Sequence, residues 1–283
     1  MPNQPLPIVQ FENVSLQYGD IWALRQISFT LIPGETRIIL GEAGSGKTTL
    51  LKAVIGLVPV DEGTITLFDK RVTSLEEREL FALRSKAGIV LQEGGLFDSL
   101  CIGENVEYPL LNQQTSDDKR KKGPPRSGSF ADRAREALCF VELEQSFGKF
   151  PSEVSGGMRR RVGIARAIVT EPPLVLYDSP TAGLDPITAN TIMALIAKER
   201  DTRKTAALIV THRYQDGELM ANFRYDAAKE ELVELSEQEQ DSPQHIQTKF
   251  MVMKEGEIVF FGTRQELESS GDEYVKRFVR HEA

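Results

Sequence analysis

The chain has 283 residues, of which 40% are hydrophobic and 27% charged, and its formal net charge is -8. This composition is typical of a globular protein with a full core, and the negative charge disfavours binding to nucleic acid. The start of the chain lacks the pattern of a signal peptide, and no apolar run approaches the ~20 residues that span a bilayer. We expect a cytoplasmic protein in which Cys101 and Cys139 pack in the core.

The N-terminal part predicts strands that lead into one glycine-rich loop. Two strands are expected over residues 7–18 and 24–31, and a third over 36–40 runs into GEAGSGKTT at residues 41–49. A helix follows from Lys47. The loop fits G-x-x-x-x-G-K-[ST], in which backbone amides and a helix N-terminus bind phosphate groups. Because the pattern arises by chance in about one chain in a hundred of this length, the order of strand, loop and helix is what favours phosphate binding.

The middle of the chain predicts helices separated by a polar segment. A helix beginning at Glu104 is expected to be limited by Pro109, because proline lacks the backbone N–H that a helix interior needs. Residues 112–128 have no hydrophobic periodicity and predict a flexible loop. Ser129 and Asp132 then have the spacing of a capping box, which predicts a helix start there.

Polar residues follow three predicted buried strands, at residues 88–91, 174–177 and 206–210. Alternating strands and helices predict a mostly parallel sheet covered on both faces, in which ligands bind at the carboxyl ends of the strands. A carboxylate there is suited to Mg²⁺. The sequence therefore predicts a site that contains three strand-end residues: Gln92, Asp178 and His212.

The C-terminal part predicts two accessory features. Residues 223–247 are expected to form an acidic insertion with a small hairpin and a mobile tail. Residues 250–253 and 258–261 flank a turn at Glu255 and Gly256, which predicts a second hairpin.

In this order, the glycine loop, Gln92, VSGGM (154–158), LVLYD (174–178), AGLD (182–185) and His212 resemble the nucleotide-binding subunit of ABC transporters. The resemblance implies an α/β P-loop NTPase fold with a mostly parallel core sheet, an antiparallel β subdomain and an inserted helical subdomain. The chain (1–283) would be one nucleotide-binding domain. Its core would comprise residues 1–92 and 171–283, and its helical subdomain residues 93–170.

The resemblance also implies which residues bind ATP. Two subunits would sandwich two ATP molecules, and Tyr18 would stack on adenine, with Trp22 as the competing aromatic. Phosphates would be bound by the glycine loop: Gly41, Glu42, Ala43, Gly44, Ser45, Gly46, Lys47, Thr48 and Thr49. The other subunit would contribute Ser155, Gly156, Gly157 and Met158, while Asp185 would link the two sites.

Catalysis in such a site depends on positioning and electrostatics. By resemblance, Thr48, Gln92 and Asp178 would hold Mg²⁺, and His212 would contact the γ-phosphate. The family normally has a catalytic Glu after the strand-end Asp, but this chain has Ser179. A serine hydroxyl is no general base near neutral pH, and such a base contributes ~10²–10⁴-fold in rate. Two interpretations stay open: slowed hydrolysis, or a structural or regulatory subunit that binds ATP and hardly hydrolyses it.

Shorter strings within this superfamily most resemble the ATPase subunits of Mla/Mce-type lipid-trafficking systems. These strings are GGLFDSL (94–100), ENV and YPL (104–110), SGGMRRR (155–161) and GLDPIT (183–188). The resemblance implies phospholipid transport, an inner-membrane permease, an MCE-type lipid-binding protein and a location on the inner face of that membrane. The second subunit would be another copy of this chain or a paralogue. No nucleic-acid partner is expected, because the chain has neither a long coiled coil nor tandem cassettes.

Overall fold

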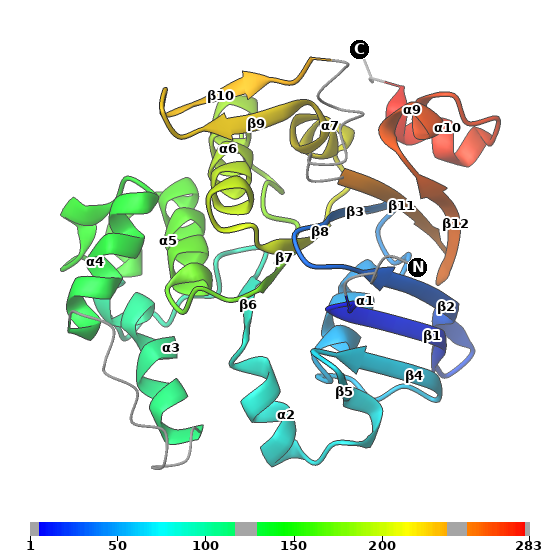
Figure 1. Ribbon diagram of the computed structural model, residues 1–283, viewed down its shortest axis with the longest axis horizontal. Coiled ribbons are helices and arrows are strands. Elements are labelled where there is room, and N and C mark those ends of the chain that lie inside the picture. Colours follow the sequence, from blue (N-terminus) through cyan, green and yellow to red (C-terminus); the bar gives the residue numbers. More distant parts are fainter. Residues whose placement is uncertain (1–5, 117–128, 237–247, 281–283) are drawn as a thin grey trace.

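A six-stranded sheet lies at the centre of the computed structural model, which describes residues 6–116, 129–236 and 248–280 (Figure 1). The strand order is β12-β11-β3-β8-β7-β6, and every neighbouring pair is parallel except β11 and β12. The strands are β3 (Thr36–Gly41), β6 (Ala87–Val90), β7 (Leu174–Asp178), β8 (Ala206–Val210), β11 (Thr248–Lys254) and β12 (Glu257–Gly262).

Strand β8 shows why this sheet forms between two cores. All five of its residues are buried, as expected for a strand covered on both faces. Ala207 and Ile209 join one hydrophobic cluster, whereas Leu208 and Val210 join the other. Side chains alternate between faces along a strand, so one continuous apolar run serves both cores.

A second, antiparallel sheet packs with the core that contains Leu208. Its order is β2-β1-β4-β5, and helices α1 (Lys47–Val54) and α2 (Glu77–Arg84) contribute Leu50, Val54 and Leu80 to the same core. Figure 1 shows this sheet beside α1, at the edge of the molecule opposite α4. Its strands are β1 (Val9–Tyr18), β2 (Ile21–Leu31), β4 (Glu62–Leu67) and β5 (Lys70–Arg71).

Helices α3 (Ile102–Ser116), α4 (Phe130–Phe140) and α5 (Gly156–Ile168) pack together and connect β6 to β7 (Figure 1). The capping box of Ser129 and Asp132 is confirmed at the start of α4. Three expectations were wrong. Helix α3 continues through Pro109 to Ser116, because packing of its buried side chains, such as Leu110, offsets one missing backbone bond. Residues 112–116 of the predicted loop at 112–128 are therefore helical, and residues 117–128 lie outside the described residues. Cys139 is exposed and Cys101 is only partly buried, so neither packs fully in the core.

The predicted hairpin within the acidic insertion is confirmed: β9 (Phe223–Asp226) pairs antiparallel with β10 (Glu231–Glu234). The predicted mobile tail, residues 237–244, lies outside the described part. The buried Arg200 of α6 (Pro186–Arg203) fastens the hairpin by donating hydrogen bonds to the carbonyls of Met220 and Phe223. Met220 belongs to α7 (Tyr214–Asn222). The hairpin after β11 is also confirmed, and α9 (Arg264–Glu268) and α10 (Glu273–Val279) follow it.

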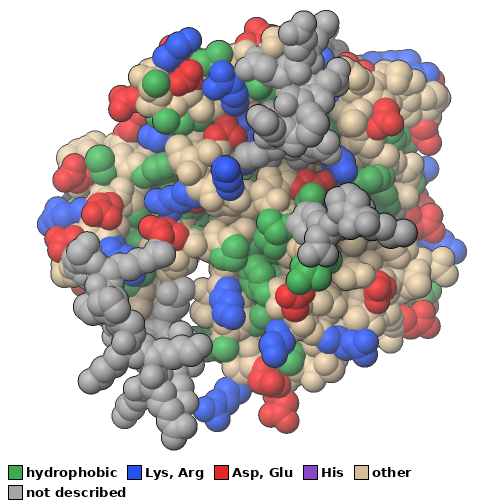
Figure 2. Space-filling model, in the orientation of Figure 1, with side chains coloured by type: hydrophobic (Ala, Val, Ile, Leu, Met, Phe, Trp, Pro, Cys, Tyr) green, Lys and Arg blue, Asp and Glu red, His purple; other side chains and the backbone are tan. Residues whose placement is uncertain are grey.

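The architecture confirms the predicted fold class: an α/β protein with a mixed sheet, an antiparallel sheet and a helical segment. The division into core and helical subdomain stays an interpretation. In the ranges that the structure describes, no helix has the length and hydrophobicity of a membrane span. Figure 2 shows acidic and basic side chains interspersed on the face drawn, without a single-sign patch.

Candidate nucleotide-binding site

The glycine loop joins β3 to α1, and its backbone requires glycine at two positions. Gly46 precedes α1 with φ at 101° in the left-handed region, and a Cβ there would lie 2.1 Å from the carbonyl oxygen of Ala23. A Cβ at Gly41 would lie 2.6 Å from the carbonyl oxygen of Met253. Both positions therefore let the loop approach neighbouring backbone more closely than any other residue permits.

Lys47 points its ammonium group into the loop. Its Nζ donates hydrogen bonds to the carbonyl oxygens of Gly41 at 2.8 Å and Glu42 at 2.7 Å, and to Ser45 Oγ at 3.2 Å. Burial lowers the pKa of Lys47, and the charges of Asp178 and Glu42 oppose that shift. The loop thus holds a cation where its sequence pattern predicts phosphate.

The end of β7 meets the start of α1. Thr48 Oγ1 donates a hydrogen bond to Asp178 Oδ1 at 3.2 Å, and Ser179 Oγ lies 3.4 Å from the same oxygen. A hydroxyl and a carboxylate are the hard oxygen ligands that Mg²⁺ prefers. Within the described ranges no group of three or more His, Cys, Asp and Glu residues could hold a metal alone. The pair therefore fits an ion that also binds substrate phosphates.

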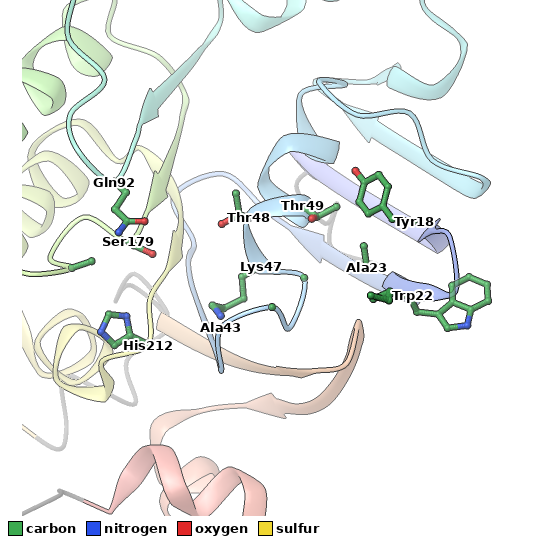
Figure 3. A pocket seen from close by; sticks show the side chains of 14 residues that line it. Tyr18, Trp22, Ala23, Ala43, Lys47, Thr48, Thr49, Gln92, Ser179 and His212 are labelled. Carbon is green, nitrogen blue, oxygen red and sulfur yellow. The ribbon is translucent and has the colours of Figure 1, made fainter.

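A cavity of about 740 Å³ opens above this loop (Figure 3). In Figure 3, Gln92, Ser179 and His212 lie on one side of Lys47, and Tyr18 and Trp22 lie on the other. The predicted strand-end residues are thus brought to the glycine loop, although Asp178 itself is not in the cavity wall. The lining residues are Tyr18, Ile21, Trp22, Ala23, Ala43, Gly44, Gly46, Lys47, Thr48, Thr49, Gln92, Ser179, Ala182 and His212.

Two aromatic side chains border the cavity at the turn between β1 and β2. Tyr18 pairs with Ile21 across this turn, while Trp22 pairs with Gln17. Tyr18 is 54% exposed and Trp22 is 38% exposed, so both offer surface to a planar ligand. Figure 3 shows the indole of Trp22 directed away from Lys47. This orientation favours Tyr18 over Trp22 as the residue that contacts a planar ligand.

Other predicted site residues lie at helix starts and do not line this cavity. Ser155 caps α5, where its Oγ accepts a hydrogen bond from the backbone N–H of Met158 at 3.2 Å. Asp185 caps α6 by accepting one from the N–H of Thr188 at 3.0 Å, and the side chain and then the backbone of Thr188 lower the pKa of Asp185 by hydrogen bonding. Ser155 and Gly156 are exposed, so the start of α5 is accessible to another molecule.

Several residues that shape the site belong to no recognisable sequence pattern. Ile21 and Ala23 line the cavity although they belong to no motif. Tyr274 of α10 also contacts the loop, since its hydroxyl accepts the N–H of Glu42 at 3.4 Å and donates to the carbonyl of Met253 at 3.1 Å. Apolar and distant contacts of this kind leave no spacing pattern in a single sequence.

Comparison with known proteins relates the sequence to one family and to named relatives. A family model described as "ABC transporter" matches residues 24–182, more than half of the chain. The chain is 35% identical over 209 residues to "Methionine import ATP-binding protein MetN 2" of Bacillus cereus, covering 72% of this chain and 59% of that protein. It is 31% identical over 204 residues to "Probable ribonucleotide transport ATP-binding protein mkl" of Mycobacterium bovis, covering 72% and 54%. The chain therefore spans little more than half the length of these two relatives.

Solved structures share the fold over most of their length. One is the dimeric ATP-binding cassette MJ0796 in a post-hydrolysis state with ADP and Pi, at a TM-score of 0.72 and 28% identity, covering 90% of this chain and 98% of that chain. Another is cbiO1 from Clostridium perfringens, part of the ABC transporter complex cbiONQ, at a TM-score of 0.72 and 25% identity, covering 96% and 94%.

Proposed function

This chain belongs to the ABC transporter family and has the fold of an ABC-type ATPase, and from that premise we propose that it binds and hydrolyses ATP to drive transport. One observation carries the proposal. Lys47 and Thr48 of the glycine loop share a cavity with Gln92 and His212, which come from the ends of separate strands. A site of this form suits phosphoryl transfer, which needs positioned polar groups rather than a covalent intermediate.

Each part of the cavity has a task in this proposal. A triphosphate would replace the carbonyls that now contact Lys47, and the start of α1 would face the phosphates with the positive end of its dipole. Tyr18 would stack on the base. Thr48 and Asp178 would hold Mg²⁺, with Gln92 as a further oxygen ligand. When bound, this ion neutralises developing charge on the phosphates.

We assign the second half of the site to another nucleotide-binding subunit. The exposed start of α5, at Ser155 and Gly156, presents backbone N–H groups that suit a γ-phosphate bound to a partner. Asp185 would lie between the two sites. The cassette MJ0796 was solved as a dimer, which supports this assembly. Light scattering in the presence of ATP tests it, and a chain that stays monomeric at saturating ATP and high concentration would contradict it.

Ser179 sets the expected rate of hydrolysis. It lines the cavity together with Gln92 and His212, which would orient the attacking water without a carboxylate base. We propose slow hydrolysis rather than ATP binding alone, because a neighbour of the same fold was captured after hydrolysis. Restoring the carboxylate in Ser179→Glu should raise turnover, by up to ~10²-fold.

Phosphate release under saturating ATP tests this proposal with three proteins: the wild type, Lys47→Ala and Ser179→Glu. Wild-type turnover should exceed that of Lys47→Ala and fall below that of Ser179→Glu. Equal rates for wild type and Lys47→Ala, measured with the permease present, would overturn the ATPase function.

We further propose a permease partner that holds the chain on the inner face of a membrane. The names of the relatives favour methionine as cargo over the phospholipid and MCE-type partner indicated by the short strings. Membrane-extracted complex in lipid vesicles should hydrolyse ATP faster when L-methionine is added. If only a change of phospholipid stimulated turnover and an MCE-type protein co-purified, phospholipid would replace methionine as the proposed cargo.

A further inference from the structure

A buried carboxylate joins the two strand ends that flank the cavity. Thr181 follows β7, Thr211 follows β8, and both hydroxyls donate hydrogen bonds to the same oxygen of Asp216, at 2.6 and 2.7 Å. Asp216 is 2% exposed and each threonine 1%. The neighbours of these threonines in sequence, Ala182 and His212, line the cavity.

A buried guanidinium makes a second connection to the same segment. Arg160 of α5 donates from Nε to the carbonyl of Gln92 at 2.7 Å, and from Nη2 to the carbonyl of Ala182. The planar fork of arginine presents its donors in a fixed geometry, which holds the two carbonyls at a set position relative to each other. One side chain on the helix that begins at Ser155 thus fixes both Gln92 and the segment after Ser179.

Together these bonds form one continuous polar connection across the site. It runs from Gln92 through Arg160 to Ala182, and from the adjacent Thr181 through Asp216 to Thr211, next to His212. Burying a carboxylate is costly, and burial raises the pKa of Asp216 while both threonines oppose that shift. An apolar cluster would fill the same space at lower cost, so stability alone does not account for the polar groups.

We propose that Arg160 and Asp216 are positioning residues, which clamp residues 181–185 between Gln92 and His212 and so align the polar side of the cavity for hydrolysis. This inference rests on the proposed ATPase function. In this proposal neither Arg160 nor Asp216 touches ATP. Each instead fixes backbone beside residues that do, where a displacement of ~1 Å can cost about 10²-fold in rate.

The alternative is that these bonds only stabilise the fold, and the chain offers matched controls. Thr205 is also buried and donates to a buried carboxylate, that of Glu199, at 3.2 Å. Arg200 is also buried and donates to two backbone carbonyls, those of Met220 and Phe223. Neither control residue lines the cavity. Thr211→Val is thus matched by Thr205→Val, and Arg160→Lys by Arg200→Lys.

Steady-state turnover, fluorescent-nucleotide binding and thermal unfolding are measured for these four variants and for Thr211→Ser. Thr211→Val and Arg160→Lys should lower kcat ~10–100-fold while KM changes less than about threefold. The controls should show comparable losses in Tm with kcat near wild type. Thr211→Ser, which keeps the hydroxyl, should restore kcat. Equal kcat for each variant and its control would overturn the positioning role.

Amide hydrogen exchange separates this inference from the proposed function. Thr211→Val should increase exchange at residues 181–185, although the substitution lies elsewhere in the sequence, and Thr205→Val should not. The clamp requires this increase whether or not the wild type hydrolyses ATP. If wild type and Lys47→Ala hydrolysed ATP equally slowly, the ATPase function would fail and the clamp could still hold. Unchanged exchange at residues 181–185 would overturn the clamp.

Discussion

Thr48 Oγ1 donates a hydrogen bond to Asp178 Oδ1 at 3.2 Å, across 130 positions of sequence. This contact joins the first residues of α1 to the end of β7 without any ligand. We interpret it as a pair of oxygen ligands already close enough to share one cation.

Thr48→Val should therefore weaken nucleotide binding only when Mg²⁺ is present. Valine has a similar volume but no hydroxyl, whereas Thr48→Ser keeps the ligand and serves as the control. We expect an affinity loss of about tenfold with Mg²⁺, equivalent to ~1.4 kcal/mol, and little change in EDTA. Titration with a fluorescent ATP analogue measures both. An equal loss in EDTA would indicate that Thr48 acts through loop packing instead.

Gly46→Ala should damage the loop far more than Gly44→Ala. Both glycines have positive φ, so each alanine carries a strain of ~1–2 kcal/mol. Only the methyl group at 46 meets backbone, at 2.1 Å from the carbonyl oxygen of Ala23, whereas a Cβ at Gly44 has nothing within 4 Å among the described residues. Nucleotide titration and thermal unfolding compare the two. Similar losses in both variants would mean that backbone strain, and not the close approach, limits the loop.

Replacing the aromatic residues should identify the one that contacts the base. Tyr18→Ala is expected to lower ATP affinity several-fold, since aromatic contacts contribute ~0.5–1.5 kcal/mol. Trp22→Ala should have the smaller effect, because its indole is directed away from Lys47 (Figure 3). Tripolyphosphate, which lacks a base, should bind both variants as it binds wild type. A larger loss for Trp22→Ala would reverse the assignment.

Glu199→Gln should make the chain more stable at neutral pH. Burial raises the pKa of Glu199 despite Arg203 and Thr205, and Oε2 has no hydrogen-bond partner among the described residues. A raised carboxyl pKa means that the folded state binds the proton more tightly, so this group's contribution to stability falls as pH rises through the folded pKa. Glutamine removes that loss.

Urea unfolding at pH 5 and pH 8 tests the sign of this pH dependence. The stability gained by Glu199→Gln over wild type should be larger at pH 8 than at pH 5. Glu136→Gln, at an exposed position of α4, is the control and should show no such difference. A gain that shrank with rising pH would show that the ion pair with Arg203, at 3.5 Å, outweighs the cost of burial.

Local sequence patterns predicted much of the fold, because each pattern arises within a single helix, strand or loop. A continuous apolar run predicted β8, the capping box predicted the start of α4, and the glycine loop predicted the link between β3 and α1. The course of α3 past Pro109 was missed, because tertiary packing overrides a local preference.

Candidate site residues at strand ends could be predicted from the sequence. Buried residues that contact the site only through other segments could not. Gln92, Asp178 and His212 follow apolar runs that any reader of the sequence can find. Arg160 and Asp216 lie within helices α5 and α7 and meet backbone or hydroxyls from distant segments. A buried polar contact between distant helices, strands or loops has no characteristic spacing in the sequence, so it becomes visible only in the folded structure.

The place of β3 in the sheet has a consequence for biosynthesis. β3 lies between β8 and β11, both of which follow it by more than a hundred and fifty residues. A ribosome that has reached residue 247 has delivered the glycine loop but not β11, whose Met253 carbonyl packs against Gly41. Such distant pairing is slow and exposes unfinished edges. Nascent chains stalled before β11 should fail to retain ATP, so the nucleotide can stabilise this fold only near the end of translation.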